Sequence, residues 1–207
     1  MPQPRLACFD LDNTLIDRDA AFLDWARAWC DEAGLGAAGV EWLTAHDGGG
    51  FVPRAELFAG LRQEFGSAPT VESYDREHPL FTYAENAVLE GLSALRDAGW
   101  RVAVVTNGTV VQQTLKLEHT GIAAVVDYCC VSEAVGVRKP EAEIFAIAAR
   151  EAGAALDGWM VGDHPVYDVA GGQNSGLRTI LVGDRRGGPV ADHQVESVLD
   201  AFRIVIG

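Results

Sequence analysis

The sequence has 207 residues, of which 48% are hydrophobic, enough for one substantial core or a core with a small accessory domain. Its 30 acidic residues outnumber 16 basic ones and give a formal charge of −14, which repels nucleic acid and anionic membranes, so we expect neither as a partner. The chain contains no low-complexity tract and no internal repeat, which argues against a disordered protein or a solenoid.

The four cysteines and the start of the chain indicate the cellular compartment in which the protein is expected. Cys8, Cys30, Cys129 and Cys130 have no CxxC spacing and no histidine at zinc-site distance, so neither a zinc site nor a disulfide framework is expected. The first four residues lead directly into an apolar run that is too short for a signal peptide or a membrane span. We therefore expect a cytoplasmic protein.

Short apolar runs alternate with helical patterns along most of the chain. The runs have the length of strands buried on both faces, as in a parallel sheet; in chain order they are Leu6–Phe9, Val102–Val105, Ala123–Val131, Trp159–Val161 and Thr179–Val182. Between them, helices are predicted at Glu85–Ala98, Val110–Thr120 and Glu141–Ala152. This alternation predicts a Rossmann-like, doubly wound α/β core.

One segment departs from the alternation. Between Asp17 and Ala84 the sequence shows helical patterns, at Ala20–Ala33 and Pro53–Phe65, and no convincing strand. The segment is too long for a single crossover helix. We therefore predict an inserted α-helical cap over residues 17–84 and an α/β core formed by residues 1–16 and 85–207.

Paired carboxylates follow the first predicted strand. Asp10 and Asp12 are two residues apart, so an extended chain directs both to one side. Hydrolysis through a covalent intermediate would give each a role, one as nucleophile and the other as acid and then base. An acidic loop that caps a helix would explain the pair equally well.

Polar residues also follow the second strand and precede a later helix. Thr106 and Asn107 lie where a helix start could bind an anion, although a routine helix cap is the alternative. Pro140 favours an extended conformation at Lys139, whose ammonium could bind phosphate, although an ordinary surface lysine is the alternative.

The fourth strand is followed by two more carboxylates. Asp163 comes directly after the buried run, and a carboxylate there that faces two others suits Mg²⁺ with several bound waters. Asp168 could bind a metal-bound water, pair with Lys139, or cap a helix.

These four groups, taken in this order, resemble the motifs of the haloacid dehalogenase superfamily, phosphatase branch. The stretch Asp10–Thr14 matches the DxDxT motif, Thr106 the second motif, Lys139 the third, and Asp163 with Asp168 the fourth. The resemblance covers nearly the whole chain, and the insertion after the first motif resembles the family's helical cap of the first type.

The resemblance implies a role for each matching residue. Asp10 would form an aspartyl-phosphate, and Asp12 would protonate the leaving group and then activate water. Asp10, the backbone carbonyl of Asp12, and Asp163 would bind Mg²⁺. Thr106, Asn107 and Lys139 would hold the phosphate, and Asp168 would act one layer behind the metal ligands. The expected reaction is Mg²⁺-dependent hydrolysis of a small phosphorylated metabolite such as a sugar phosphate, a phosphoglycolate-like compound or a nucleotide monophosphate.

Other functions stay open at this point. A 2-haloacid dehalogenase also uses an aspartate nucleophile, but that branch typically lacks the second aspartate that Asp12 provides. A phosphomutase shares the first half-reaction. A phospho-receiver signalling module also combines aspartates, a threonine and a lysine, but usually has no helical cap. In the predicted cap, His46, Asp47 and Arg54 could contact substrate, although exposed loop residues are the alternative.

Overall fold

The computed structural model describes residues 3–184 and 187–207, so four residues of the predicted core lie outside the described part. A sheet of parallel strands forms the centre, in the order β3-β2-β1-β4-β5-β6. The strands are β1 (Leu6–Phe9), β2 (Arg101–Thr106), β3 (Tyr128–Val131), β4 (Gly158–Gly162), β5 (Arg178–Val182) and β6 (His193–Val195). The strand order reverses direction around β1, which confirms the doubly wound α/β core.

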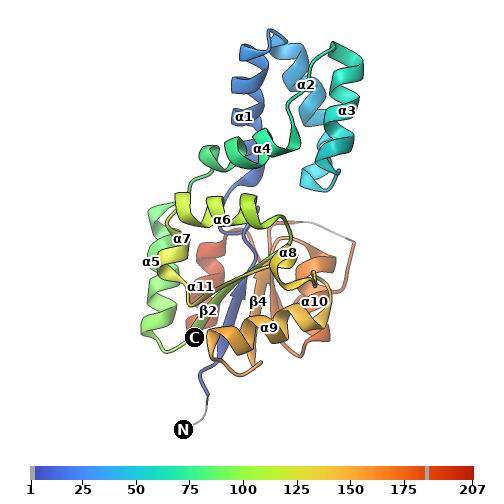
Figure 1. The fold of residues 1–207 in the computed structure, drawn as a ribbon. Helices are drawn as coiled ribbons and strands as arrows, with labels where there is room; N and C mark the ends of the chain where they lie inside the picture. The colour runs from blue at the N-terminus through green and yellow to red at the C-terminus, as the bar shows by residue number, and fades with distance from the viewer. Residues whose placement is uncertain (1–2, 185–186) are drawn as a thin grey trace.

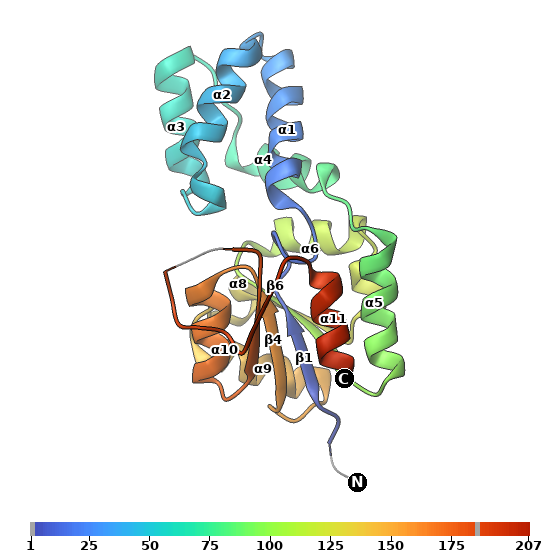
Figure 2. The ribbon, with the colours of Figure 1, turned by 180° about the vertical axis from the view of Figure 1, so that it is seen from behind.

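Helices cover both faces of this sheet (Figures 1 and 2). They are α5 (Asn86–Asp97), α6 (Val110–His119), α7 (Ile122–Val125), α8 (Ser132–Val135), α9 (Ala142–Ala152), the π-helical turn η3 (Pro165–Ala170), α10 (Gly171–Asn174) and α11 (Val198–Ile206). The side chains of β1 alternate between the faces: Phe9 packs with α5 and α11, whereas Cys8 packs with α9. The sheet is therefore buried on both sides, as its continuous apolar runs indicated.

The segment between β1 and α5 is helical and contains no strand among the described residues, apart from an isolated β-bridge between Asp12 and Ile16. Its helices and turns are α1 (Arg18–Glu32), α2 (Gly36–His46), the 3₁₀ turn η1 (Gly48–Gly50), α3 (Arg54–Phe65), α4 (Val71–Glu77) and the 3₁₀ turn η2 (His78–Phe81). This group, called the helical cap below, has its own core, in which Trp25 and Tyr74 lie with ring centroids 4.7 Å apart. It stands beyond the carboxyl ends of the strands (Figure 1).

Several sequence-based expectations differ from the structure, and helices α4 and α11 are among the elements that were not predicted. The run Ala123–Val131 is not one strand, because α7 ends at Val125 and β3 begins only at Tyr128. The edge strand β6 and the helix α2 were not predicted. β6 is largely exposed and lacks an apolar run, and α2 contains two glycines, which weaken its helical pattern. None of the helices in the described ranges has the length and apolar character needed to cross a membrane.

Candidate active site

The ends of three neighbouring strands bring the predicted residues to one edge of the sheet. Asp10 directly follows β1, and its backbone N–H donates to the carbonyl of Val161 in β4 at 2.9 Å. Thr106 is the last residue of β2, and Asp163 directly follows β4. Because parallel strands share one carboxyl edge, residues far apart in the sequence meet there.

A tight turn connects this edge to the helical cap. Asn13 has a φ of 58°, a left-handed conformation that asparagine tolerates better than most residues. Its Oδ1 accepts hydrogen bonds from the backbone N–H groups of Arg18 (3.0 Å) and Asp19 (3.2 Å). Asp17 caps the same helix start by accepting from the N–H of Ala20. The strand that carries Asp10 is thereby linked directly to helix α1.

Lys139 lies at the centre of the acidic group. Its Nζ donates to Asp10 Oδ1 at 2.6 Å and to Asp168 Oδ1 at 2.7 Å, and the residue is 2% exposed. Burial alone would lower the pKa of Lys139, but the charges of Asp10 and Asp168 outweigh it and raise the pKa above its usual value. The ammonium therefore stays charged beside Asp10.

Asp168 is held from behind by the backbone. Its Oδ2 accepts from the N–H of His164 at 2.9 Å, while Oδ1 accepts from Lys139. A Cβ on Gly162 would lie 2.3 Å from the Asp168 carboxylate, so only glycine permits this close approach. Both oxygens of Asp168 already accept hydrogen bonds, which suits a side chain that orients Lys139.

The carboxylates are suited to hold a cation. Ligand oxygens of Asp10, Asp163 and Asp168 lie within 4.8 Å of one another. Burial raises the pKa of Asp10 to about 8; Lys139 opposes this increase, while Asp168 and Asp163 add to it. A divalent cation would offset this excess negative charge, and clustered carboxylates are ligands that Mg²⁺ prefers. Asp10 and Asp163 are the best placed, since Asp168 is occupied; the carbonyl of Asp12 as a further ligand stays a prediction.

Asn107 and Thr106 form contacts other than those expected from the sequence. The side-chain amide of Asn107 donates to the backbone carbonyl of Lys139 (3.0 Å) and accepts from its N–H (2.9 Å). Thr106 Oγ1 accepts from Gln113 Nε2 at 2.5 Å and is buried. The Asn107 side chain thus positions Lys139, and its contact with phosphate stays a prediction.

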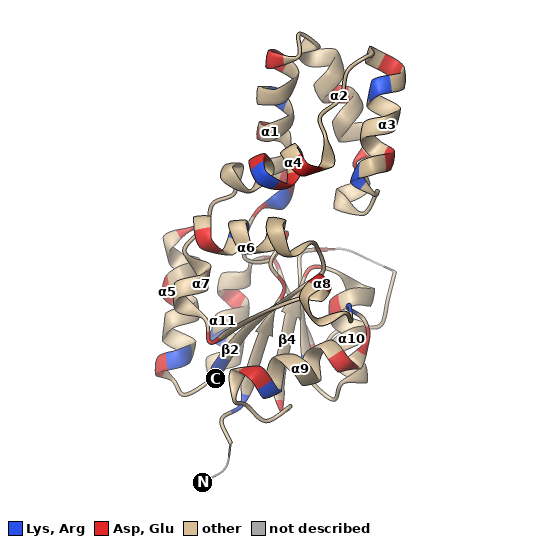
Figure 3. Cartoon of the chain, in the orientation of Figure 1, with Lys and Arg blue, Asp and Glu red and all other residues tan. Residues whose placement is uncertain are grey.

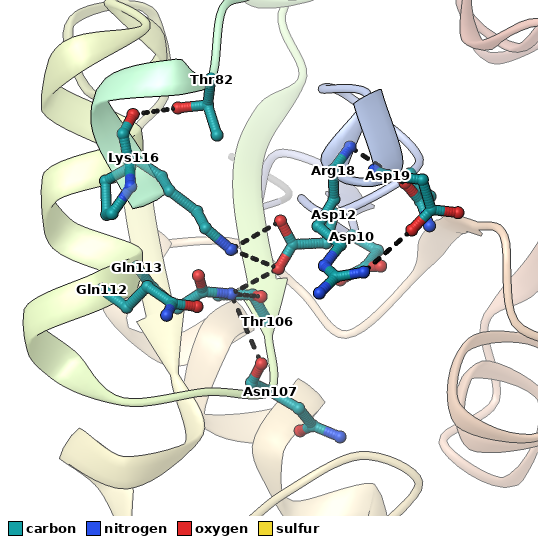
Figure 4. Close-up of polar contacts among 12 residues, drawn as sticks. Asp10, Asp12, Arg18, Asp19, Thr82, Thr106, Asn107, Gln112, Gln113 and Lys116 are labelled. Atoms are coloured by element: carbon teal, nitrogen blue, oxygen red, sulfur yellow. Dashed lines mark hydrogen bonds and ion pairs between the residues drawn. The ribbon is translucent and has the colours of Figure 1, made fainter. Parts of the chain in front are cut away.

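Asp12 has partners that the sequence did not suggest (Figure 4). Lys116 Nζ donates to both oxygens of Asp12 at 2.8 Å, and Gln113 Nε2 donates to Oδ2 at 3.1 Å. Burial would raise the pKa of Asp12, but Lys116 and then Gln113 outweigh this effect and lower it. Burial lowers the pKa of Lys116, which Asp12 partly opposes. Asp12 is therefore held as a carboxylate at neutral pH.

The three cap residues suggested by the sequence lie in different environments. Asp47 is 4% exposed and accepts from Arg54 Nη1 at 2.6 Å and from Arg18 Nη2 at 2.8 Å, with a further bond from Arg18 Nη1. His46 is exposed and stacks on Trp42. Arg54 lines the cavity described next, whereas Asp47 and His46 do not.

A cavity of about 290 Å³ joins the strand edge to the helical cap. The core residues that line it include Asp10, Asp12, Thr106, Asn107, Lys139, Asp163 and Asp168, together with Lys116 and Arg138. The cap residues that line it are Arg18, Gly49, Gly50, Phe51, Val52, Pro53, Arg54, Tyr74 and Asp75. All seven core residues named from the sequence therefore meet at one cavity. The arrangement offers a carboxylate that could act as a nucleophile, a second carboxylate, a buried ammonium and a carboxylate cluster that could hold a cation.

Sequence analysis missed Arg18, Lys116, Gln113 and Tyr74. Gln113 and Lys116 are three residues apart on a predicted helix, so they share a face, and that spacing was the available signal. Arg18 lies four residues after the first motif, but nothing in its sequence context indicates burial. Tyr74 lies in the short helix α4, which the sequence did not resolve.

Comparisons with known proteins agree with this geometry. Residues 7–182 match the family model described as haloacid dehalogenase-like hydrolase. A phosphoserine phosphatase from Thermus thermophilus is 32% identical over 184 residues, which are 80% of this chain and 70% of that protein. A phosphoglycolate phosphatase from Agrobacterium fabrum is 29% identical over 190 residues, 87% of this chain and 81% of that protein.

Other matches are shorter or support the fold alone. Two further relatives align over only 39–40% of their own length. The crystal structure of a phosphatase from Thermococcus onnurineus has a TM-score of 0.71 and 22% identity, covering 97% of each chain. Structures of 2-haloacid dehalogenases have TM-scores of 0.65–0.72 at 21–23% identity. At such identities the structural likeness establishes the fold and does not separate these activities.

Proposed function

This chain belongs to the haloacid dehalogenase-like hydrolases, and we propose that it is a Mg²⁺-dependent phosphatase that acts on a small phosphorylated metabolite. The observation that carries the proposal is the position of Lys139, which is buried between Asp10 and Asp168 beside Asp163. The related phosphoserine and phosphoglycolate phosphatases support the same reaction class.

Asp10 is the proposed nucleophile. Its carboxylate oxygen attacks phosphorus, a new O–P bond forms, and the bond from phosphorus to the leaving oxygen breaks. Lys139 holds Asp10 in place and adds positive charge where the phosphoryl group arrives. Thr106 and the backbone at Asn107 lie at the end of β2, where they can contact the phosphoryl oxygens.

Asp12 is the proposed acid and then base. It gives a proton to the leaving oxygen in the first step, takes one from water in the second, and that water attacks phosphorus to release phosphate and restore Asp10. Lys116 favours the carboxylate form needed for the second step. A substrate phosphate adds negative charge beside Asp12 and thereby favours the protonated form needed for the first.

Mg²⁺, when bound by Asp10 and Asp163, would neutralise charge on the phosphoryl oxygens and keep Asp10 ionised.

The helical cap, residues 17–84, is proposed to cover the strand edge, to limit access of water and to contact the leaving group. A cavity of about 290 Å³ accommodates a small metabolite rather than a folded phosphoprotein.

Dehalogenation has less support. Cleavage of a carbon–halogen bond requires no proton donor for the leaving group, whereas Asp12 lies in the cavity with two dedicated partners. The same purified protein can be tested for halide release from 2-chloropropionate, which we expect to be absent.

The direct test measures phosphate release from an aryl phosphate. We expect activity to disappear in excess EDTA and to return with added Mg²⁺, because the carboxylate cluster needs a cation. Asp163→Asn removes one ligand charge and should raise the Mg²⁺ concentration for half-maximal activity by roughly tenfold or more.

Asp157→Asn is the matched control, because Asp157 lies before β4, at the opposite end of the same strand, and is exposed. Its Mg²⁺ dependence should equal that of the wild type. Full activity in excess EDTA, or halide release without phosphate release, would refute the proposed function.

A further inference from the structure

Two arginine side chains enter the cavity from the helical cap. Arg18 is the first residue of α1 and Arg54 the first residue of α3. Basic positions lie at the ends of α1 and α3 that face the core (Figure 3). The N-terminal end of a helix carries partial positive charge, so both positions add to the attraction for an anion.

Both side chains share the cavity with the proposed nucleophile. Arg18 and Arg54 line it from above, while Asp10, Thr106 and Lys139 line it from the sheet edge. A phosphate ester bound at Asp10 therefore has its leaving group directed toward the two guanidinium groups.

One buried carboxylate serves both guanidinium groups. Arg18 is 5% exposed and the Arg54 side chain 11% exposed, and both pair with Asp47. Asp47 also accepts from the N–H of Gly50 at 2.8 Å. Arg18 has a second partner, Asp19, but that carboxylate is 58% exposed, so solvent screens the pair. The buried group of Arg18, Arg54 and Asp47 therefore carries two positive charges and one negative charge.

Aromatic rings fix the orientation of the guanidinium groups. Arg18 lies over Phe22 with its Cζ 4.7 Å from the ring centroid, and Arg54 lies over Tyr74 at 5.4 Å. Such stacking leaves guanidinium edges available for hydrogen bonds. The Nε of Arg54 has no acceptor among the residues that the structure describes.

Asp75 is a half-buried cap carboxylate that also lines the cavity. Its Oδ1 accepts from Gln112 of α6 at 3.0 Å. Burial raises the pKa of Asp75 above its usual value, and the hydrogen bond from Gln112 partly opposes this. Within the part of the cap that the structure describes, Arg18 and Asp47 are buried and Arg54 is largely buried.

From these contacts we propose that Arg18 and Arg54 bind a second anionic group on the leaving group of the substrate. The inference rests on the proposed phosphatase function and narrows it to phosphomonoesters that also carry a carboxylate or a second phosphate. Asp47 is a positioning residue, because it holds the two guanidinium groups without lining the cavity. Guanidinium groups bind carboxylates and phosphates alike through paired N–H donors. The geometry therefore predicts a negatively charged group at this position, and the substrate comparison below distinguishes a carboxylate from a phosphate.

The first experiment compares pairs of phosphomonoesters in which one member carries a second anionic group on the leaving group and the other member does not. Phosphate release is measured for phosphoglycolate and its uncharged amide, and for propane-1,3-diol bisphosphate and 3-hydroxypropyl phosphate. We expect kcat/KM of the wild type to favour the charged member of at least one pair by roughly 100-fold. The pair with the larger ratio identifies whether a carboxylate or a phosphate is preferred.

The second experiment repeats the comparison in variants. Arg54→Gln should lower the charged-to-uncharged ratio by roughly 30-fold, and Arg54→Lys should restore part of it because the charge returns without the paired donors. Arg62→Gln is the matched control: Arg62 lies on the same helix, is exposed, and is far from the cavity lining, so its ratio should equal that of the wild type.

The outcomes separate this inference from the proposed function. If no probe, including an aryl phosphate, releases phosphate, the phosphatase proposal fails. If all probes are hydrolysed and both charged-to-uncharged ratios are near one, the phosphatase proposal stands and the anion site is refuted. An unchanged ratio in a folded Arg54→Gln protein also refutes it. Should Arg54→Gln fail to fold, the wild-type ratios decide alone.

Discussion

At the scale of single residues, Asp47 carries a buried negative charge between two guanidinium groups. Burial would raise the pKa of Asp47, but hydrogen bonds and charge from Arg18, followed by those from Arg54, outweigh it and lower the pKa. A group whose pKa is lower in the folded state stabilises the fold at pH values above its unfolded pKa, which is about 3.9 for aspartate. This stabilisation is lost as the pH falls through the lower, folded value.

Asp47→Asn should therefore destabilise the protein at neutral pH. Removing one partner of a buried ion pair leaves charge uncompensated, and we expect a loss of about 3 kcal/mol in the free energy of unfolding at pH 7. The difference from the wild type should begin to shrink as the pH falls below about 4, because the unfolded wild-type chain then takes up a proton at Asp47, and it should vanish below the lower, folded pKa. Urea unfolding of both proteins across this range measures the effect.

Asp31→Asn is the control, because Asp31 lies exposed on α1. Its stability should follow that of the wild type at every pH. A constant difference between Asp47→Asn and the wild type from neutral to acid pH would contradict the electrostatic explanation and point to lost packing instead.

At the scale of elements, strands were easier to predict than the contacts between them. Continuous apolar runs predicted β1, β2, β4 and β5 because a parallel sheet is buried on both faces. The run Ala123–Val131 merged α7 with β3, because a short helix and a strand of apolar residues cannot be told apart by composition alone.

Helix α6 illustrates which part of the site could not be predicted. Its range was close to the prediction, but the direction of its polar face toward Asp12 depends on how α6 packs on the sheet. Similarly, the sequence placed Asn107 at a strand end, but its clamp on the Lys139 backbone joins segments separated by 32 positions. Motif residues could be named because strand ends converge, whereas their partners depend on tertiary packing.

At the scale of the whole molecule, the hydrophobic residues form separate cores. Two lie on the faces of the sheet and a third lies within the helical cap, where Leu61 is fully buried. Because the cap has its own core, we expect it to lose structure without unfolding the sheet.

Leu61→Ala tests this independence. Removing a buried leucine side chain costs about 2–5 kcal/mol, and the loss should fall on the cap. Hydrogen exchange should accelerate at amides of α1, α2 and α3 while β1, β2 and β4 keep their protection. Leu92→Ala, in the core beside the sheet, is the matched deletion and should accelerate exchange in the strands. If hydrogen exchange in Leu61→Ala accelerates equally in the cap and in the sheet, the two unfold together as one cooperative unit.

The central claim is that Asp10 carries the phosphoryl group during turnover. The most direct measurement is an acid-quenched single turnover of an aryl phosphate, followed by mass spectrometry of the peptide that contains Asp10. We predict a transient phosphoryl adduct on Asp10 in the wild type, and neither adduct nor turnover in Asp10→Asn, whose near-isosteric side chain preserves the fold. Steady phosphate release without an adduct at Asp10, together with retained turnover in Asp10→Asn, would contradict the account.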